Sequence, residues 1–345
     1  MNRSSIHLLD LPDEILLIIL KKLNNIDVLY SLLDINNGRL NILAQENTFI
    51  NTVKFITIDD MCLIDRFCSD ILPRIHQNVK CFIIDPVFME RILLATTYPN
   101  LNKLEIFHFQ QQIVLNYFTG RNRVLDGTCV QRDILDYMPQ LHSFTFYIGT
   151  YVNTIGLSYK LSNEDIRRTL TNIGQQHATS IVNYVSTDKA ACSIFSLPFA
   201  FDYLEHLGNV FPNIVFSYVT YLLVEDDDPF KHEFFIRIAR SFPLLKYLRI
   251  FNIESAVLCD LMTFESGNSG SHSIVEYSDL TSLDVRYGHR DYVEQFLNET
   301  KTYAPCLTEL GVVDIHLKTV TKNFTRDETR HNCVKIISDY LLWDH

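Results

Sequence analysis

Histidine and cysteine side chains are common metal ligands and nucleophiles, and this chain has twelve histidines and eight cysteines. Zinc sites place these residues at short spacings such as His-Glu-x-x-His or Cys-x-x-Cys, and neither spacing occurs. His108 and His142 fall near expected strand ends, and His272 and His289 fall in expected loops. We expect structural roles for these four histidines, and the sequence predicts no metal site and no cofactor.

Other motifs that could carry chemistry are isolated. His289-Arg290-Asp291 spells a kinase catalytic-loop triplet, but no glycine-rich loop precedes it and no Asp-Phe-Gly follows it. Neither a G-x-G-x-x-G sequence nor a Walker loop is present. The acidic stretch 225–228 offers too few ligands at defined spacing for calcium, so it is expected to be a solvated loop. We therefore expect a protein that is not an enzyme.

Composition narrows the class of protein further. The 345 residues carry a formal charge of −11 and are 47% hydrophobic. The hydrophobic fraction is sufficient for a core, and an acidic balance without a basic run argues against nucleic-acid binding. No apolar stretch approaches the roughly 20 residues of a membrane span, and no secretory signal is evident. The scattered cysteines then indicate reduced, mostly buried side chains, so we expect a cytoplasmic or nuclear protein without membrane contact.

The chain opens with a strongly apolar stretch, residues 8–23, that predicts a helix. Asp10 is expected to cap its start, Pro12 fits the first turn, and Lys21 and Lys22 favour its end. The residues at 15–20 are all apolar, so no face of this helix is suited to water. Such a helix is expected to be covered on several sides, by its neighbours and by a second protein.

Two more short helices are expected nearby, at 26–33 and 40–49, because apolar residues recur there at helical spacing. Three short helices in so short a span make a core that is too small to be stable unaided. This part of the chain is therefore expected to need a partner or the rest of the chain for its stability.

The same residues resemble a known motif. Leu11-Pro12-Asp13-Glu14-Ile15, the apolar run, Leu23 and Asp27-Val28-Leu29 together resemble an F-box, whose motif begins with Leu-Pro-x-Glu. The resemblance covers residues 8 to about 50. It implies a three-helix domain at 1–52 that docks on the Skp adaptor of an SCF ubiquitin ligase and, through that adaptor, on the cullin–RING assembly. The resemblance assigns eight residues to adaptor binding: Leu11, Pro12, Glu14, Ile15, Ile18, Ile19, Leu23 and Leu29.

A recurring phrase appears after residue 50, in which an aromatic or Met residue and often Pro precede Leu-x-x-Leu-x-Ile. Each phrase predicts the end of a helix and then a strand whose alternate side chains face inward. Strands are expected at 79–84, 101–107, 144–146, 219–224, 248–250, 283–285 and 310–312. A degenerate repeat is expected near 180–185. One continuous buried row is expected to contain Leu104, Phe144, Leu248, Leu283 and Leu310.

The intervening segments show helical spacing. Helices are expected at 87–97, 133–137, 163–175, 199–210, 229–241, 253–263, 290–302 and 328–343. Strand–turn–helix units at this period resemble leucine-rich repeats. The predicted fold class is α/β: a small N-terminal three-helix F-box followed, at 53–345, by an irregular leucine-rich-repeat-like α/β solenoid with a parallel sheet. An ordinary α/β domain that reuses the phrase at helix ends is the alternative.

On each expected strand, the side chains between the inward leucines face the concave surface of the array. Aromatic residues beside arginines are typical of recognition surfaces, and the arginines favour a partner with carboxylates or phosphates. The alternative is that adjacent loops cover these aromatic residues. Nine residues are predicted to bind a protein substrate: Lys103, Glu105, Phe107, Tyr147, Tyr247, Arg249, Phe251, Asp284 and Arg286.

These features together predict the substrate-recognition subunit of an SCF-type cullin–RING ubiquitin ligase. The F-box would dock the Skp adaptor, and the repeat array would bind an unknown protein substrate. The alternative is a repeat scaffold for protein–protein interaction, unconnected with ubiquitin, whose N-terminal helices cap the array. A hydrolase or a transferase is the least favoured class.

Overall fold

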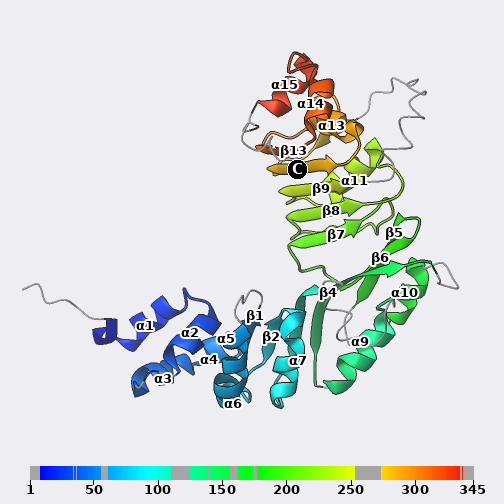
Figure 1. Ribbon diagram of the computed structural model, residues 1–345. Helices are drawn as coiled ribbons and strands as arrows, with labels where there is room; N and C mark the ends of the chain where they lie inside the picture. The colour runs from blue at the N-terminus through cyan, green and yellow to red at the C-terminus, as the bar shows by residue number, and fades with distance from the viewer. Residues whose placement is uncertain are drawn as a thin grey trace, which may run out of the picture. The chain divides into compact units, whose positions relative to one another are not determined.

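The protein is an α/β structure with parallel sheets and several helices (Figure 1). The computed structural model describes residues 8–33, 35, 37–55, 61–109, 124–138, 140–155, 162–171, 173, 177–252, 273–334 and 336. The chain divides into two compact units, of which the first comprises residues 1–120, 125–148 and 169–178. The second comprises residues 121–124, 149–168 and 179–345. The predicted domain boundary at residue 52 falls within the first unit and stays a prediction.

Short helices begin the first unit. They are η1 (Leu8–Asp10), α1 (Asp13–Leu20), α2 (Asn25–Leu32), α3 (Gly38–Ala44) and α4 (Asn47–Ile50). Pro12, not Asp10, occupies the N-cap position of α1, and no side chain caps that end of the helix. The single helix predicted at 40–49 is two helices, because Gln45 and Glu46 leave the helical backbone region between them.

Side-chain amides order these helices and fix them to the first strand. Asn37 caps α3 by accepting hydrogen bonds from the backbone amides of Arg39 and Leu40. The side-chain amide of Asn25 donates to the carbonyl oxygens of Thr48 and Thr52, at 3.2 and 2.9 Å. Because Thr52 begins the first strand, the helices of residues 13–50 are anchored to the sheet of the first unit.

Four parallel strands, in the order β1-β2-β3-β4, begin a six-stranded sheet. They are β1 (Thr52–Phe55), β2 (Cys81–Ile84), β3 (Lys103–Phe109) and β4 (Ser143–Asn153), and β4 continues into the second unit. The helical segments between them are α5 (Met61–Arg66), the π-helix η2 (Phe67–Ile71), α6 (Leu72–Ile75), α7 (Pro86–Ala95), α9 (Gly127–Asp133) and η3 (Leu135–Tyr137). The strands predicted at 79–84, 101–107 and 144–146 are therefore confirmed.

The second unit contains a five-stranded parallel sheet in the order β13-β11-β9-β8-β7. Its strands are β7 (Tyr203–Leu207), β8 (Tyr221–Glu225), β9 (Tyr247–Phe251), β11 (Ser282–Tyr287) and β13 (Glu309–Gly311). Two-residue strands β10 (Val275–Glu276) and β12 (Thr302–Tyr303) pair with each other. The helices are α10 (Asn163–Thr169), α11 (His232–Ser241), α13 (Arg290–Leu297), α14 (Asp314–Thr321), η5 (Asp327–Thr329) and α15 (Arg330–Cys333). The figure shows α11 and α13 on one face of this sheet (Figure 1).

One backbone arrangement sets the register of both sheets. The amides of Thr220 and Tyr221 both donate to the carbonyl oxygen of Asp202, and those of Lys246 and Tyr247 both donate to Thr220. The same paired donation recurs at the start of β2, β3, β4, β11 and β13. Because each carbonyl has two lone pairs, one oxygen can hold two consecutive amides of the next strand. This paired donation therefore sets the register in which neighbouring strands begin.

This register aligns the buried positions across each sheet. Leu222, Leu248 and Leu283 pair in turn, and Leu310 pairs with Leu283, each at most 1% exposed. In the first unit, Leu104 pairs with Phe144, and both are buried. The five predicted core positions are thus buried, but the prediction of one continuous row is wrong. They belong to two separate sheets because the chain inserts other strands between β4 and β7.

Those inserted strands are β5 (Ala178–Ser186) and β6 (Lys189–Ser196). They are neighbours in the sheet order β4-β6-β5, and only two residues join them, so they form a hairpin. The strand predicted at 180–185 exists, but no helix follows it, so it is not a strand–turn–helix unit. Nearly every residue of β6 is buried, and the period-2 alternation that marks a half-exposed strand is therefore missing.

One predicted helix is wrong. Residues 199–210 contain β7 instead, since Tyr203 and Leu204 pair with Tyr221 and Leu222. The apolar spacing in this short segment fits a helix and a strand equally well, and pairing with β8 decides for the strand. Helices are confirmed within 229–241 and 290–302, whereas the helix predicted at 253–263 lies outside the described residues.

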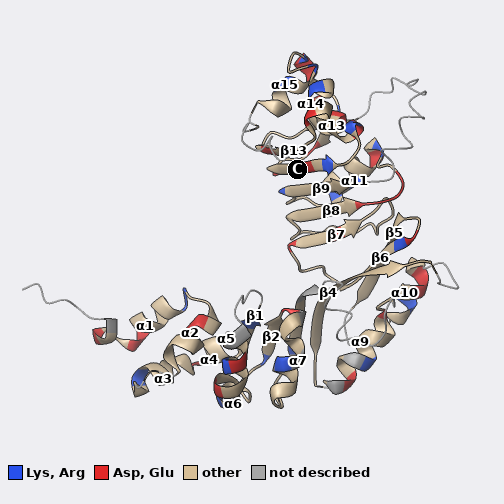
Figure 2. Cartoon of the chain, viewed as in Figure 1, with Lys and Arg blue, Asp and Glu red and all other residues tan. Residues whose placement is uncertain are grey.

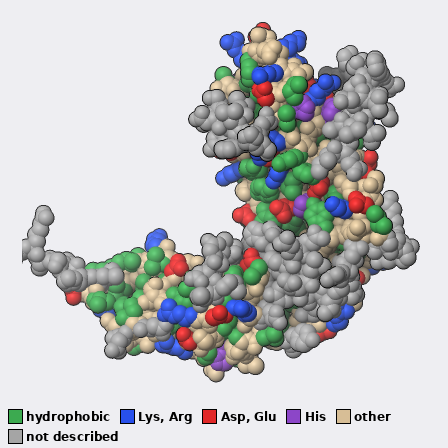
Figure 3. Space-filling view, in the orientation of Figure 1, with side chains coloured by type: hydrophobic (Ala, Val, Ile, Leu, Met, Phe, Trp, Pro, Cys, Tyr) green, Lys and Arg blue, Asp and Glu red, His purple; other side chains and the backbone are tan. Residues whose placement is uncertain are grey.

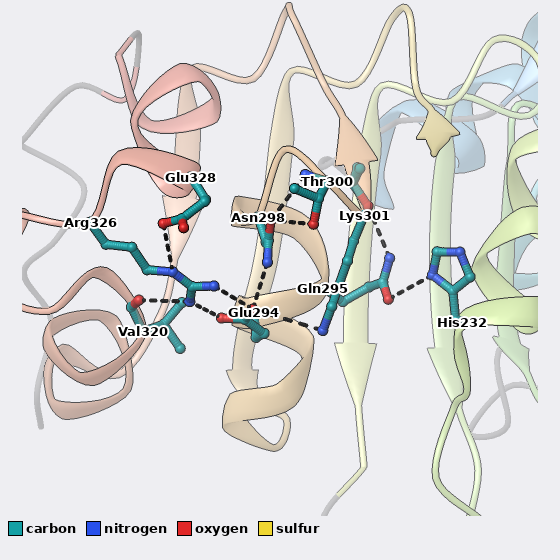
Figure 4. A network of polar contacts seen from close by, with 10 residues as sticks. His232, Glu294, Gln295, Asn298, Thr300, Lys301, Val320, Arg326 and Glu328 are labelled. Atoms are coloured by element: carbon teal, nitrogen blue, oxygen red, sulfur yellow. Dashed lines mark hydrogen bonds and ion pairs between the residues drawn. The ribbon is translucent and has the colours of Figure 1, made fainter. Parts of the chain in front are cut away.

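A polar network holds the C-terminal helices of the second unit together (Figure 4). Glu294 on α13 accepts two hydrogen bonds from the Arg326 guanidinium, at 2.5 and 3.0 Å, and one from Asn298 at 2.8 Å. Burial alone would raise the pKa of Glu294, but the hydrogen bonds and charge of Arg326 outweigh it and lower that pKa. Arg326 also donates to the carbonyl oxygen of Val320 and so links α13 to the end of α14.

The buried row of the second sheet predicts a large cost for truncating one leucine. Leu248→Ala removes a side chain with no exposed surface, so we expect a loss of about 2–5 kcal/mol of unfolding free energy. Hydrogen exchange of the amides of β8, β9 and β11 measures this loss within the second unit. Leu244→Ala is the control, because Leu244 is 46% exposed, and its effect should be within about 0.5 kcal/mol. Equal effects of the two substitutions would contradict the buried row.

The Glu294 network predicts a pH dependence of stability. A carboxylate whose folded pKa is lowered stabilises the protein above its unfolded pKa, and this contribution is lost as the pH falls through the folded pKa. Glu294→Gln should therefore cost roughly 1–3 kcal/mol at pH 7 and progressively less at acid pH. Unfolding of the second unit followed across the acid range tests this expectation. The exposed Glu299→Gln is the control, and a pH profile of Glu294→Gln parallel to that of the wild type would contradict it.

Candidate functional site

Apolar side chains lie on the outside of α1. We call Leu9, Ile15, Ile18, Ile19 and Leu23 the α1 patch, and these residues are between 40% and 57% exposed. Leu16 is the buried residue of the helix. The space-filling view shows hydrophobic side chains gathered over the N-terminal helices (Figure 3). The helix predicted to be covered on several sides packs along one edge, and its other apolar side chains face solvent. Cover of these side chains by a second protein stays a prediction.

One guanidinium holds the segment that precedes α1. Arg39 at the start of α3 donates from its Nη atoms to the carbonyl oxygens of Leu9 and Leu11, at 2.8 and 2.5 Å. Its Nε donates to Asp13 Oδ1 at 2.6 Å. Three contacts from one planar side chain fix the backbone of residues 9–13 against α3. The apolar residues on either side of Pro12 are thereby held in one conformation.

The remaining predicted adaptor residues divide by exposure. Pro12 and Glu14 are exposed and Leu11 is partly exposed, so they border the α1 patch in sequence. Leu29 is wrongly assigned to a contact surface, since it is fully buried in α2, where it faces the core of the first unit. Two further apolar residues, Ile35 and Ile42, are 45% and 68% exposed and were not predicted. The signal for Ile42 was its position two residues after Leu40, on the side of α3 away from Leu40 and Leu43.

A second surface with aromatic and charged side chains lies on the second sheet. We call it the arginine face, and it consists of Tyr221, Tyr247, Arg249, Phe251, Asp284, Arg286 and Tyr287. Tyr221 pairs with Tyr247 and Arg249 pairs with Asp284, so the face is built by the same register as the leucine row. The space-filling view shows basic side chains among hydrophobic ones over β8, β9 and β11 (Figure 3).

Asp284 is the centre of the arginine face. Its side chain is 4% exposed, and both of its oxygens accept hydrogen bonds from Arg286, at 3.0 and 2.8 Å. Arg249 Nε lies 3.4 Å from Asp284 Oδ2, so the two side chains form an ion pair. This buried Nε makes no hydrogen bond. One buried carboxylate therefore holds two arginine side chains that are 34% and 43% exposed.

Electrostatics follow from this geometry. Burial would raise the pKa of Asp284, but hydrogen bonds from Arg286 and the charges of both arginines outweigh it and lower that pKa. The hydrogen bond to Asp284 in turn raises the pKa of Arg286. Burial and the nearby charge of Glu205 raise the pKa of the Tyr221 phenol, and Arg249 opposes this rise. The pair of arginines with one aspartate carries a local charge of about +1.

Aromatic rings flank the arginines on both sides along the strands. Tyr221 and Tyr247 stack with their ring centroids 5.1 Å apart. Phe251 and Tyr287 contact each other at 5.2 Å, and the Arg249 guanidinium lies 5.4 Å from the Tyr287 ring centroid. Gly311 leaves the space that the arginine pair needs. A Cβ there would lie 2.9 Å from Asp284 Oδ1 and 3.2 Å from Arg286 Nε.

Other residues of the predicted substrate surface are placed differently. Tyr147 is wrongly assigned, because it is 4% exposed in β4, and Asp284 is buried beneath the arginines rather than open to a partner. Lys103 and Glu105 pair with each other on β3 in the first unit. The side chain of Phe107 lies outside the described residues. The structure therefore brings Tyr247, Arg249, Phe251, Asp284 and Arg286 together on the second sheet, whereas Lys103, Glu105 and Tyr147 belong to strands of the first unit.

A titratable cluster that the sequence did not indicate lies at the ends of β7 and β8. Tyr151 and His206 both contact Glu225 Oε2, at 2.5 and 2.7 Å, and Tyr151 also bonds His206 Nδ1. His206 has a left-handed backbone, with φ of 59°. The acidic turn 225–228 begins here and is drawn in red after β8 (Figure 2). The carboxylate of Asp226 accepts hydrogen bonds from the backbone amides of Asn209 and Asp228. It therefore closes the turn and joins it to the segment that follows β7.

Within the described ranges, the structure shows neither a metal-binding cluster nor a membrane-spanning helix. There, no three His, Cys, Asp or Glu side chains gather in a way that could hold a metal ion. The described helices are also all too short or too polar to cross a bilayer. Burial raises the pKa of the Cys81 and Cys333 thiols to about 11, so both are protonated at neutral pH.

Comparison with known proteins gives little further information. No protein-family model matches the chain, and no curated protein matches it. Among solved structures, the chain is similar to one in a crystal structure of the Rad7 and Elc1 complex in yeast, with 11% identity and a TM-score of 0.27. That alignment covers 92% of this chain and 74% of the other chain. A similarity at this level carries no conclusion about fold or function.

The close approach of Gly311 to the arginine pair predicts the effect of adding a methyl group. Gly311→Ala must displace Asp284 or Arg286, so we expect a loss of about 1–3 kcal/mol of unfolding free energy. Gly149→Ala is the matched control, because its Cβ would meet only Ser193 Oγ at 3.9 Å within the second unit. Chemical unfolding of both variants, compared with the wild type, measures the difference. An unchanged stability of Gly311→Ala would show that the pair is not held against β13.

Proposed function

We propose that this protein is the substrate-recognition subunit of an SCF-type cullin–RING ubiquitin ligase. In this proposal the N-terminal helices are an F-box that docks the Skp adaptor, and residues 53–345 are an irregular leucine-rich-repeat-like array. The arginine face then binds a protein substrate. The receptor itself performs no chemistry and accelerates ubiquitin transfer by holding substrate lysines near the loaded conjugating enzyme.

The observation that carries the proposal is the outward-facing α1 patch, whose residues lie on both sides of Leu11-Pro12-Asp13-Glu14 in the sequence. Contiguous exposed apolar patches are uncommon on soluble proteins and mark interaction sites. Because the isoleucine side chains of this patch are 40–57% exposed, burying the rest of each one against a partner would contribute about 1 kcal/mol. The Leu-Pro-x-Glu opening identifies which partner to expect, because it resembles the F-box motif.

The Arg39 contacts support the same function. A docking segment that is already ordered loses less conformational entropy on binding, and Arg39 fixes the backbone of residues 9–13 before any partner arrives. Asp13 is paired with Arg39, and the exposed Glu14 at the border of the patch favours a partner with a basic residue beside an apolar groove.

The alternative function is a repeat scaffold unconnected with ubiquitin, in which residues 8–50 cap the array. One observation favours it: α2 and α4 pack on β1, as capping helices would. Capping, however, leaves the outward apolar side chains of α1 without a role. The two functions differ in one outcome, since only the ligase subunit recovers the Skp adaptor and a cullin.

A co-purification experiment tests the proposal. The full-length wild-type protein, expressed in cells, should recover the Skp adaptor and a cullin. Ile18→Asp should lower recovery by about tenfold or more, since a charge buried at an interface costs over about 1.4 kcal/mol. The Leu11→Ala, Pro12→Ala double variant should also lower recovery, since it removes apolar surface from the docking segment. Both variants should keep residues 55–345 folded.

The control is Ile315→Asp, which introduces the same charge at an isoleucine on α14 that is 67% exposed. It should recover the adaptor as the wild type does. Wild-type protein that recovers neither the adaptor nor a cullin would favour the scaffold. Self-association that Ile18→Asp abolishes would instead identify the α1 patch as a contact between two copies of this chain.

A further inference from the structure

The charged side chains of the arginine face determine which ligand charge fits it. Two arginines alone would suit any acidic partner, including a phosphorylated one. Asp284 changes this, because its buried carboxylate already neutralises about one of the two positive charges. The charge left for a ligand is therefore about +1, which a single carboxylate balances and a phosphate dianion exceeds.

The hydrogen bonds of the two arginines also favour a carboxylate ligand. Arg286 uses Nε and one Nη on Asp284, and the other N–H groups of its partly exposed guanidinium make no hydrogen bond to a described residue. Arg249 faces Asp284 through its buried Nε, and its side chain as a whole is 34% exposed. Two planar cations that share one buried anion form a site for a second carboxylate on their outer side, since each guanidinium has five N–H donors.

Acidic residues around this centre oppose a more highly charged ligand. Glu205 follows Tyr203 by two residues on β7, Glu225 pairs with Phe251, and Glu309 pairs with Ser282. These three carboxylates lie on strands that flank or contain the arginine face. Additional anionic groups in a partner would approach these carboxylates, and bringing like charges close together is unfavourable.

The aromatic rings specify what surrounds the carboxylate in the partner. On β9 the aromatic residues Tyr247 and Phe251 lie two residues before and after Arg249, a distance of about 6.5–7 Å, and Tyr221 and Tyr287 pair with them on the neighbouring strands. An extended segment laid along the strands has its alternate side chains at the same spacing. A carboxylate on the arginines therefore places the side chains two positions away over the Tyr221–Tyr247 stack and over Phe251 and Tyr287.

We propose that the arginine face binds an extended segment of a partner protein through one carboxylate side chain flanked, two positions away on each side, by apolar or aromatic side chains. Asp284 is a positioning residue, which orients both guanidiniums and does not contact the partner. This inference deepens the substrate-receptor part of the proposed function and names the substrate chemistry of that surface.

An array of acetylated, amidated peptides with the pattern apolar-x-Z-x-apolar tests the proposal with the full-length protein. The apolar positions vary over Leu, Ile, Phe and Tyr, and Z is Glu, Gln or phosphoserine. We expect Glu peptides to retain the protein about tenfold more than their Gln counterparts and more than their phosphoserine counterparts. Retention that prefers phosphoserine, or that does not distinguish Glu from Gln, would overturn the proposal.

Matched variants locate the selection on the arginine face. Arg249→Gln with Arg286→Gln should abolish the preference for Glu, whereas Lys246→Gln, which removes one exposed charge just before β9, should keep it. The double variant leaves Asp284 buried without a cation, so the same double variant with Asp284→Asn provides the folded comparison, checked by circular dichroism. A preference for Glu that survives in this folded variant would overturn the proposal.

The adaptor experiment separates the two proposals. Loss of the Glu preference with normal recovery of the Skp adaptor would leave the ligase function standing and overturn the assigned substrate chemistry. A Glu preference in a protein that recovers no adaptor would support the peptide-binding face and overturn the ligase function.

Discussion

The structure depends on one repeated backbone interaction, in which a single carbonyl oxygen accepts two consecutive amides of the next strand. Asp202, Thr220, Lys246 and Thr281 provide these carbonyls in the second unit, and Asn51, Lys80 and Asn102 provide them in the first. The interaction fixes where each strand starts relative to its neighbour. One consequence is that leucines stack behind the sheet, and another is that the residues after them stack in front. Core and candidate binding surface therefore have the same origin.

The sequence predicts the part of this arrangement that repeats. Leu248 and Leu283 occupy equivalent places in the recurring phrase, and they pair in the sheet. The same alignment implies that Arg249 neighbours Asp284, so the ion pair was within reach of sequence reasoning. Its consequence was not, because the burial of Asp284 depends on Arg286 folding back after a shift in the pairing of β11. That local irregularity leaves no signal in the spacing of hydrophobic residues.

Two kinds of segment escaped prediction for other reasons. β6 is buried on both faces and lacks alternation, and β7 is too short for its apolar spacing to exclude a helix. At the N-terminus, the composition of α1 indicated the helix but not its surroundings. Whether an apolar side chain such as Ile18 faces the core or the solvent depends on the few neighbours available, and residues 8–50 supply enough to bury only one edge of that helix.

Because the register is set where each strand begins, the connections between strands need no fixed length. Tyr221, Tyr247, Ser282 and Glu309 are partners across successive strands, although their spacings along the chain are uneven. Insertions and deletions between one strand's end and the next strand's start therefore leave the alignment of the sheet unchanged. Evolution can remodel these connections, and with them the borders of the arginine face, while the leucine row behind it stays the same.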